Sequence, residues 1–384
     1  MNKSNQPPAG VLGLGMEAFL APGVYVPDAR RPSVGPSLAA RIRAAAGRSR
    51  ADVLEAWRSK ALANTLQSLR NRRDWTGPWY RRGVTALKYL VRSACMPVRH
   101  VCFLAFIDAY PVMGAYRRRD PRLLERHMHR FINATWSRGD RLNYLQQHYR
   151  FALAHFPRGL FERVYALGHA HLGSLTAKDG SVLKLCLRPP ILKGCEGELC
   201  LQLCDAHDEP LYSIVFTVAD EKPTIMIGCL QGPRGENARG AVRELTRNMH
   251  GMRPKQLMLS LVYAFAHHYG IDKLVAIGND AHPLRRSGRP VYSDYDAFWE
   301  EQQGKRIGGG WFALPPSQAH KAPVDVPSNH RAAFRRREAL RQQAEHVLIR
   351  ALAQSVPDVV PVSKHGQARV RTSSPVVAGF RNGL

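Results

Sequence analysis

The hydrophobic pattern of this chain changes once, at Leu167, and the change limits the folds that the chain can form. Between about residues 36 and 166, apolar residues recur three and four positions apart, which is the spacing of helices with one buried face. The segments with this spacing are SLAARIRAAAG, ADVLEAWRSKALANTLQSL, VTALKYLVRSAC, PRLLERHMHRFINATW and RLNYLQQHYRFALAHF. The sequence therefore predicts a basic, all-helical region over residues 36–166.

After Leu167 the apolar runs are short and are separated by turn residues. SVLKLCLRP, GELCLQLCD, LYSIVFTVAD and PTIMIGCLQG are bounded by DG, KG, HDEP and DEKP, a pattern that predicts an antiparallel meander. Two helices, the strand DKLVAIGN, the helix YDAFWEEQQG and the strand GWFALP follow. We therefore expect an α+β domain over residues 167–353, with a mixed, mainly antiparallel sheet, flanking helices and an Arg-rich last helix over 329–353.

The two ends of the chain have a different composition from the rest. Residues 1–35 are rich in Pro and Gly, and residues 354–384 are rich in Pro, Ser and Gly, so both are predicted to be disordered. The apolar stretch near the N-terminus is interrupted by Glu17, Pro and Gly, which makes it a poor secretory signal. The apolar run over 101–116 contains Asp108 and is too short to cross a bilayer. A core helix is the favoured interpretation of this run, and an interfacial helix with a basic collar is the alternative.

The formal net charge of +26 predicts a polyanionic partner. Nucleic acid, an anionic lipid or membrane surface, and a phosphorylated cofactor or acidic carrier protein all meet this requirement. The cations are dense over 70–82, 117–119 and 334–341, although a solvated surface would explain any one of these runs. A nucleic-acid role is the weaker choice, since the sequence has no helix-turn-helix, zinc-finger or RNP-like motif.

Seven cysteines, an odd number, occur without the spacing of a disulfide scaffold. Cys195, Cys200 and Cys204 come nearest to a metal pattern, but they lack a CxxC spacing and lie in an alternating, strand-like run. Buried, reduced cysteines are favoured over a zinc site, and no metal is expected. The chain is therefore interpreted as cytoplasmic, with peripheral attachment to the inner membrane as an extension of the charge argument.

The turn HGMRPK is the first candidate binding site. Gly251, Arg253, Pro254 and Lys255 stand directly before a long amphipathic helix. Helix N-termini present unpaired N–H groups and favour bound phosphate, and proline suits the first helical position. We expect Gly251, Arg253 and Lys255 to hold a pyrophosphate, with an ordinary helix–helix turn as the alternative.

A second turn and a polar loop lie at the ends of two neighbouring strands. Gln231 and Gly232 follow the strand TIMIGCLQ, and Asn279 and His282 follow DKLVAIGN, at the carboxyl end of the predicted sheet where sites in open sheets usually lie. Gln231, Gly232 and Asn279 are candidate cofactor-binding residues, and His282 is a candidate general base. A simple turn and a surface histidine are the corresponding structural alternatives.

Two further side chains are candidates for catalysis. Glu198, with Glu196 beside it, places a carboxylate near the sheet in a basic chain, where it could accept a proton from an attacking amine. Solvent-facing carboxylates would explain the pair equally well. Tyr295 lies four residues before Trp299 on one helix face, which an aromatic core stripe also explains.

Several long strings make the chain resemble the VirK/YbjX-like proteins of Gram-negative bacteria over roughly residues 120–350. They are EGELCLQL, LYSIVFTV, IGCLQGP, LTRNMHGMRPKQLML, AIGNDAH, YDAFWEE, GWFALP and RRREALR. The resemblance implies a role in virulence, outer-membrane or lipopolysaccharide properties, and tolerance of antimicrobial peptides. It implies no particular reaction and no catalytic residues.

A second resemblance is to the GNAT-type N-acyltransferase fold. The order of TIMIGCLQ, MRPKQLMLSLVYAFAHHYG, DKLVAIGN, the helix at Tyr295 and GWFALP is similar to the order of strands and helices in that fold. The departures are an inserted helix over 236–250 and HGMRPK in place of a Gly-rich loop. The resemblance implies acyl-CoA or acyl-carrier protein as the donor, and Tyr295 as the acid that protonates the leaving thiolate.

Two functions of different classes follow. The first is an acyl-transfer enzyme at the cytoplasmic membrane face, which binds a phosphopantetheine-bearing donor. An amine or hydroxyl of the acceptor attacks the thioester of this donor directly. The second is a non-catalytic protein that uses its basic surface to bind anionic lipid, lipopolysaccharide precursors or nucleic acid.

Overall fold

The computed structural model describes four stretches of the chain, together with Ser59 and Val324: residues 62–190, 195–284, 294–318 and 326–353. The described residues from 62 onward belong to one compact unit. The predictions of disorder for 1–35 and 354–384 fall outside the described residues, as does the helical prediction for most of 36–61.

The described part of the N-terminal region is helical, as predicted. After a helical turn over 62–68, the elements are α3 (Trp79–Ala94), α4 (Pro97–Ala109), α5 (Pro111–Arg119), the 3₁₀ helix η1 (Pro121–Met128), α6 (Arg138–His155), α7 (Arg158–Phe161) and the π-helix η2 (Glu162–Leu167). Pro97 and Pro111 occupy the first positions of α4 and α5, where a missing N–H costs nothing. Ser137 and Asp140 form a capping box that begins α6.

One predicted helix is wrong. PRLLERHMHRFINATW was expected to be a single α-helix, but its first half is the 3₁₀ helix η1, and Phe131 and Asn133 then form an isolated bridge. Seven of the eight residues of η1 are buried, so no polar face faces solvent. The backbone that follows bonds to distant loops, from Ile132 N–H to the Cys195 carbonyl at 2.7 Å and from Ala134 N–H to the Ala281 carbonyl at 2.9 Å.

The predicted α+β class is confirmed by an eight-stranded mixed sheet with the order β1-β2-β3-β4-β5-β6-β8-β7. The strands are β1 (Ala170–Thr176), β2 (Val182–Arg188), β3 (Leu199–Cys204), β4 (Pro210–Ala219), β5 (Thr224–Gln231), β6 (Lys273–Ile277), β7 (Lys305–Ile307) and β8 (Trp311–Leu314). The sequence pattern missed β7, whose three residues are exposed and carry no alternation.

The only parallel pair among the named strands, β5 with β6, is paired over a short stretch. It runs from Thr224 opposite Lys273 to Ile227 opposite Ala276, while β5 continues to Gln231. Directly after the paired stretch, Gly228 is an extra residue in β5, because Phe216 opposes Ile227 and Val215 opposes Cys229. The end of β5 thus lies beyond its last pairing with β6.

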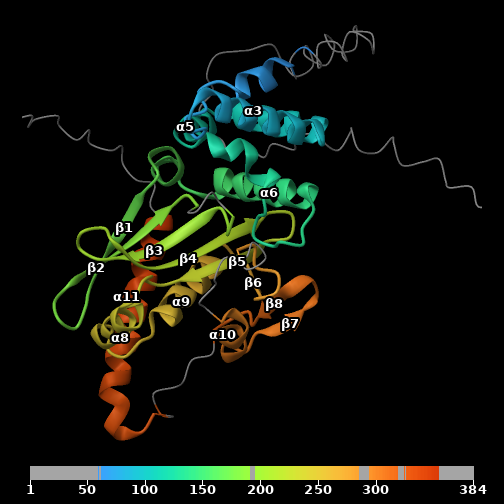
Figure 1. Ribbon diagram of the computed structural model, residues 1–384. Coiled ribbons are helices and arrows are strands. Elements are labelled where there is room, and N and C mark those ends of the chain that lie inside the picture. Colours follow the sequence, from blue (N-terminus) through green and yellow to red (C-terminus); the bar gives the residue numbers. More distant parts are fainter. Residues whose placement is uncertain are drawn as a thin grey trace, which may run out of the picture. The chain divides into compact units, whose positions relative to one another are not determined.

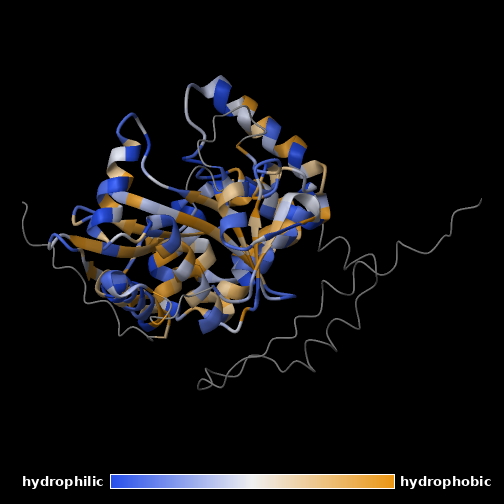
Figure 2. Cartoon of the chain, turned by 90° about the horizontal axis from the view of Figure 1, so that it is seen from below, coloured by the Kyte–Doolittle hydropathy of each residue, from blue (hydrophilic) through white to orange (hydrophobic). Residues whose placement is uncertain are grey.

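The C-terminal half supplies helices that cover the sheet (Figure 1): α8 (Ala238–Asn248), α9 (Pro254–His268), α10 (Tyr295–Glu301) and α11 (Arg331–Ala353), with short 3₁₀ turns at Gly308–Gly310 and Ser328–His330. α9 contacts β3 and β4, and α11 contacts α9, β1 and β2. From the N-terminal region, α6 packs against β4. Figure 2 shows the hydrophobic colour running along the central strands.

The core interpretation of the apolar run over 101–116 is confirmed. Phe103, Leu104, Ile107 and Met113 are all fully buried and belong to the main hydrophobic cluster. Among the described residues, no single helix is long and apolar enough to cross a membrane; α3 and α4 meet that test only as a pair, bent by 108°.

We predict that Gly228→Ala destabilises the protein by about 1–3 kcal/mol or more, as overpacking does in a dense core. A Cβ at this position would lie 2.0 Å from the Glu196 carbonyl oxygen, which is backbone and cannot turn aside. Gly83→Ala in α3 is the control, because its Cβ meets nothing within 4 Å. It should stabilise the helix by about 0.5–1 kcal/mol. Urea unfolding of both variants measures the difference, and equal stability would contradict the bulge assignment.

Candidate functional site

Two buried carboxylates lie where β3 begins, and they face different partners. Glu196 is 3% exposed and Glu198 is 0% exposed, so the solvent-facing interpretation of this pair is wrong. Gly197 between them has φ +145, a conformation that other residues rarely adopt. This glycine allows the chain to turn between the two carboxylates.

Glu198 is part of a buried ionic cluster. Its Oε2 contacts the Arg126 guanidinium and accepts a hydrogen bond from the Tyr149 hydroxyl. Arg126 also donates to the Tyr116 hydroxyl at 2.6 Å and to Asp120 Oδ2 at 2.9 Å. Burying a charge is costly unless it is paired, so these groups hold one another in place.

The charges of this cluster explain an unusual titration. Burial raises the pKa of Glu198 to about 7, and the attraction of Arg126 offsets only part of that rise. The pKa of Arg126 is also raised, because its carboxylates outweigh its burial. A raised pKa of Glu198 and a raised pKa of Arg126 are compatible because of Asp120. The pKa of Asp120 is lowered, so this carboxylate stays charged and neutralises Arg126 even when Glu198 is protonated.

A second buried cluster contains Glu196, and it brings together two of the predicted catalytic residues. Glu196 Oε1 lies 3.7 Å from His282 Nε2, and the His282 ring stacks on Tyr295 with centroids 5.2 Å apart. The Tyr295 hydroxyl contacts Cys229 Sγ at 3.6 Å and accepts a hydrogen bond from the Leu230 N–H at 3.3 Å. His282 is 1% exposed, so the surface-histidine interpretation is wrong.

Proton positions in this cluster follow from its hydrogen bonds and its burial. His282 Nδ1 accepts from the Leu284 N–H, which places the proton of the neutral ring on Nε2, facing Glu196. Burial raises the pKa of Glu196, although Cys229 and Arg234 offset part of the rise. Burial also raises the pKa of Tyr295 well above its ordinary range. The cluster is therefore a buried group of titratable side chains, in which both the carboxylate and the tyrosine have raised pKa values.

The structure places Tyr295 through the start of α10. Asp294 caps this helix by accepting from the Ala297 N–H. The Asn279 side chain donates to Asp294 at 2.7 Å and accepts from the Tyr295 N–H at 3.1 Å. Tyr295 and Trp299 stack in the core, as the aromatic-stripe interpretation expected. Both polar groups of the Asn279 side chain are thus engaged within the protein, and its observed role is to position Tyr295.

The turn at Gly251 forms as predicted. Pro254 begins α9, and Gly251 has φ +84 with no atom closer to its Cβ position than Arg337 Nη1 at 4.0 Å. Arg253 pairs with Glu301, and both side chains are 45% exposed. Lys255 lies over the Phe298 ring at 5.1 Å, and burial lowers its pKa.

This turn fits a phosphate group, although one of its cations already has a partner. The open Gly251 position and the nearby Arg337 leave room and positive charge at the first turn of α9. The Arg253–Glu301 pair is half exposed, and such pairs contribute little stability, so a phosphate can replace the carboxylate.

The second predicted turn is filled by the protein itself. A Cβ on Gly232 would lie 2.5 Å from the Tyr212 ring, so close packing against this ring requires the glycine. Gln231 is half-buried at the last paired position of β5, opposite Ser213. Neither residue lines the two cavities described next.

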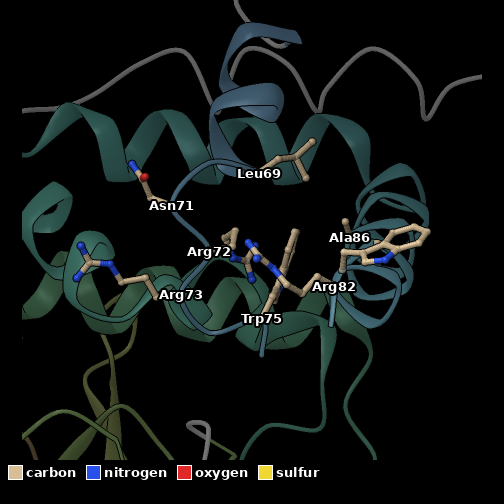
Figure 3. A pocket seen from close by; sticks show the side chains of 9 residues that line it. Leu69, Asn71, Arg72, Arg73, Trp75, Arg82 and Ala86 are labelled. Atoms are coloured by element: carbon tan, nitrogen blue, oxygen red, sulfur yellow. The ribbon is translucent and has the colours of Figure 1, made fainter. Parts of the chain in front are cut away.

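Two cavities lie in the helical region, away from the predicted residues. The larger, of about 550 Å³, is lined by Leu69, Asn71, Arg72, Arg73, Trp75, Trp79, Arg82, Gly83 and Ala86 (Figure 3). The smaller, of about 230 Å³, is lined by Asp74, Trp75, Thr85, Lys88, Arg92, Arg122, Glu125, Arg126 and His129. The charge of the run RNRRDWTGPWYRR does not by itself indicate a cavity; the signal in the sequence is the pair of tryptophans flanked by arginine clusters.

Among the described cysteines, Cys200 and Cys204 are buried and Cys195 is half-buried. Within the described ranges, no group of three or more His, Cys, Asp or Glu side chains could hold a metal ion.

Comparisons with known proteins give a family and several relatives. The profile of the family described as "Protein of unknown function (DUF535)" matches residues 79–349. The uncharacterized protein YbjX of Escherichia coli K12 is 28% identical over 267 residues, which cover 67% of this chain and 80% of that protein. A protein of Mannheimia haemolytica named membrane protein LapB is 26% identical over 194 residues, covering 50% of this chain and 81% of that protein.

Among solved structures, a mutant of a cAMP-binding acyltransferase from Mycobacterium smegmatis matches with a TM-score of 0.25 and 11% identity. The match covers 56% of this chain and 61% of the acyltransferase chain, which is less than two thirds of its length.

We predict that Glu198→Gln removes a pH dependence of stability. The pKa of Glu198 is about 7 in the folded protein and near 4.5 when unfolded. Between these values the folded state binds the extra proton, so this residue's contribution is complete below about 4.5 and is lost as pH rises through about 7. The loss is at most about 3 kcal/mol. Urea unfolding from pH 5 to 8 measures it.

The control is Asp120→Asn in the same cluster. The pKa of Asp120 is lowered, so its contribution is lost instead as pH falls. A Glu198→Gln variant that keeps the wild-type slope between pH 5 and 7 would contradict the titration of this carboxylate.

Proposed function

The chain belongs to the DUF535 family, and from that premise we propose that it is an acyltransferase with a phosphate-bearing donor, acyl-CoA or acyl-carrier protein. One observation carries the proposal: the Tyr295 hydroxyl and the Leu230 N–H meet beyond the last pairing of β5 with β6, beside buried Glu196 and His282. Preorganised donors in a dry site are what an acyl-transfer reaction requires.

The donor supplies an acyl group on a thioester. In the proposal, the Gly251 turn, Arg253, Lys255 and Arg337 bind its phosphates at the start of α9. These residues and the Tyr295 cluster are linked, because Arg253 pairs with Glu301 at the end of the helix that Tyr295 begins. Binding of phosphate at Arg253 can therefore alter the position of α10.

In the proposal, side chains of the protein accept and donate the protons of the reaction. Burial raises the pKa of Glu196, which makes it a stronger base than an ordinary carboxylate, and it accepts the proton of the attacking amine or hydroxyl with His282 Nε2 as the neighbouring group. As the acceptor nitrogen or oxygen bonds to the acyl carbon, the C–S bond of the thioester breaks and the leaving thiolate takes the proton of the Tyr295 hydroxyl. Burial raises the pKa of Tyr295, so the hydroxyl is protonated before the reaction, and it lies next to the Leu230 N–H. In this assignment Glu196 takes the role of base that the sequence reading gave to Glu198, since Arg126 engages Glu198 in the core.

The setting of the reaction is part of the proposal. The VirK/YbjX-like resemblance supports an envelope or lipopolysaccharide acceptor at the cytoplasmic face of the inner membrane, with effects on virulence and antimicrobial peptide tolerance. The name of the Mannheimia relative, a membrane protein, is in accord with peripheral membrane attachment. An acidic carrier protein would meet the basic surface of this chain.

We predict that the Arg253→Ala, Lys255→Ala double variant weakens binding of acyl-CoA by at least about tenfold, because charge-assisted bonds to phosphate are lost. Isothermal titration calorimetry with acetyl- and long-chain acyl-CoA measures the change. Arg336→Ala is the control, since it removes an exposed arginine of α11 next to Arg337. Absence of binding heat for the wild type with these donors and with acyl-carrier protein would refute donor binding.

We predict that Tyr295→Phe lowers kcat by about 10²–10⁴-fold and leaves the donor Kd unchanged, as expected for loss of a proton donor. The measurement is release of free thiol from acyl-CoA in the presence of amine and hydroxyl acceptors. Tyr263→Phe is the control, because it removes a hydroxyl that only bonds the Pro315 carbonyl. Equal rates for the two variants would exclude Tyr295 from the chemistry.

A further inference from the structure

The N-terminal helices expose an apolar face. Of the fourteen exposed large hydrophobic residues among those described, nine lie between Leu62 and Val98: Leu62, Leu66, Trp79, Tyr80, Val84, Leu87, Leu90, Val91 and Val98. Trp79 is 84% exposed and Leu87 is 61% exposed. A concentration of this kind marks an interaction surface, because scattered apolar residues are normal and contiguous ones are not.

The same stretch carries positive charge and no negative charge. From Trp75 to Ile107 the sequence has no Asp or Glu, while it has Arg81, Arg82, Lys88, Arg92 and Arg99. Arg82 and Lys88 are exposed, and neither forms an ion pair with any described residue. Exposed apolar side chains next to cations that lack a described ion-pair partner suit a surface in which an anionic outer layer covers an apolar interior.

The cavity of about 550 Å³ lies next to this apolar face, since Trp79, Arg82, Gly83 and Ala86 of α3 line it. Arg72 lines it and is 5% exposed, held by Asp74 at 2.9 and 2.7 Å and by Glu125. Its guanidinium lies 4.1 Å from the centroid of the Trp75 ring, and its buried Nη1 has no hydrogen-bond partner among the described residues. Figure 3 shows the Arg72 and Arg82 side chains beside Trp75. An unused buried donor, an exposed arginine and apolar walls in one cavity suit the phosphate of an amphiphile.

We propose that α3, the helical turn over 62–68 and this cavity form a docking surface for an anionic phospholipid membrane. Trp79, Leu87 and their apolar neighbours enter the boundary between headgroups and acyl chains. Arg82 and Arg72 bind a lipid phosphate in the cavity of about 550 Å³. The inference rests on the membrane attachment in the proposed function and names the surface for it, but it uses no residue of the Tyr295 cluster or of the Gly251 turn.

Charge and shape favour a lipid surface over the other polyanions. Nucleic acid would engage the cations but would leave exposed aliphatic side chains such as Leu87 and Val91 in water. A lipid surface satisfies both features at once, since it offers an apolar layer beneath a layer of phosphates. Trp79 at the edge of the face is the residue type that belongs at such a boundary.

The test uses the full chain and vesicle flotation. We expect binding to vesicles of phosphatidylglycerol mixed with phosphatidylcholine, and at least about tenfold weaker binding to phosphatidylcholine alone. Leu87→Gln and the Arg82→Ala, Lys88→Ala double variant should each weaken binding to the anionic vesicles by about tenfold. The Arg335→Ala, Arg336→Ala double variant on α11 has the same net charge as the second of these and should bind as the wild type does.

A second readout reports the depth of one side chain. Brominated acyl chains should quench the tryptophan fluorescence of the wild type, and Trp79→Phe should keep vesicle binding while losing most of that quenching. Leu87 and Trp79 are exposed, so these variants should unfold at the wild-type temperature.

Three outcomes would overturn the proposal. The first is equal weakening by the α11 double variant, and the second is RNA binding with no binding to anionic vesicles. The third is a dimer in sedimentation that Leu87→Gln dissociates, since a second copy would then cover the face. Failure of donor binding in calorimetry would leave these results unchanged, which separates this inference from the proposed enzyme.

Discussion

The buried guanidinium of Arg126 is the interaction on which the rest of the structure depends. It lies on η1 and meets Asp120 at the start of that helix and Glu198 at the start of β3. A buried charge without its partners costs several kcal/mol, so the helical region has one acceptable position against the sheet. The hydroxyls of Tyr116 and Tyr149 accept hydrogen bonds from the same guanidinium and tie α5 and α6 to it.

This junction also determines the candidate site. Because Glu198 is held toward Arg126, the chain turns at Gly197 and Glu196 faces the opposite group of partners. Gly228 makes room for the Glu196 backbone at the bulge of β5, and the end of β5 then reaches Tyr295. Two carboxylates separated by one glycine thus have different surroundings, one in the ionic cluster of Arg126 and one beside His282.

Two groups of positively charged side chains differ in their surroundings, those buried beside carboxylates and those exposed without an ion-pair partner among the described residues. Arg126 is buried and compensated by carboxylates, so it contributes structure. Arg72 is also buried and paired, but it keeps one donor at the cavity that no described residue uses. Arg82 and Lys88 are exposed without such partners and surround apolar side chains, so they are free to meet an anionic surface. Net charge alone predicts a polyanionic partner, and the distribution of paired and unpaired cations is what selects the surface proposed for it.

Local pattern was sufficient for the fold class, the strands that alternate and the helix that begins at Pro254, because periodicity and proline act over a few residues. It also selected Tyr295 and His282, which follow strand and cap signals in the sequence. It could not separate Glu196 from Glu198, predict that η1 is a buried 3₁₀ helix, or find the cavity beside Trp75. Those features are set by partners 50 or more residues away, such as Glu125 for Arg72 and Glu198 for Arg126, and only the packed structure brings such charges together.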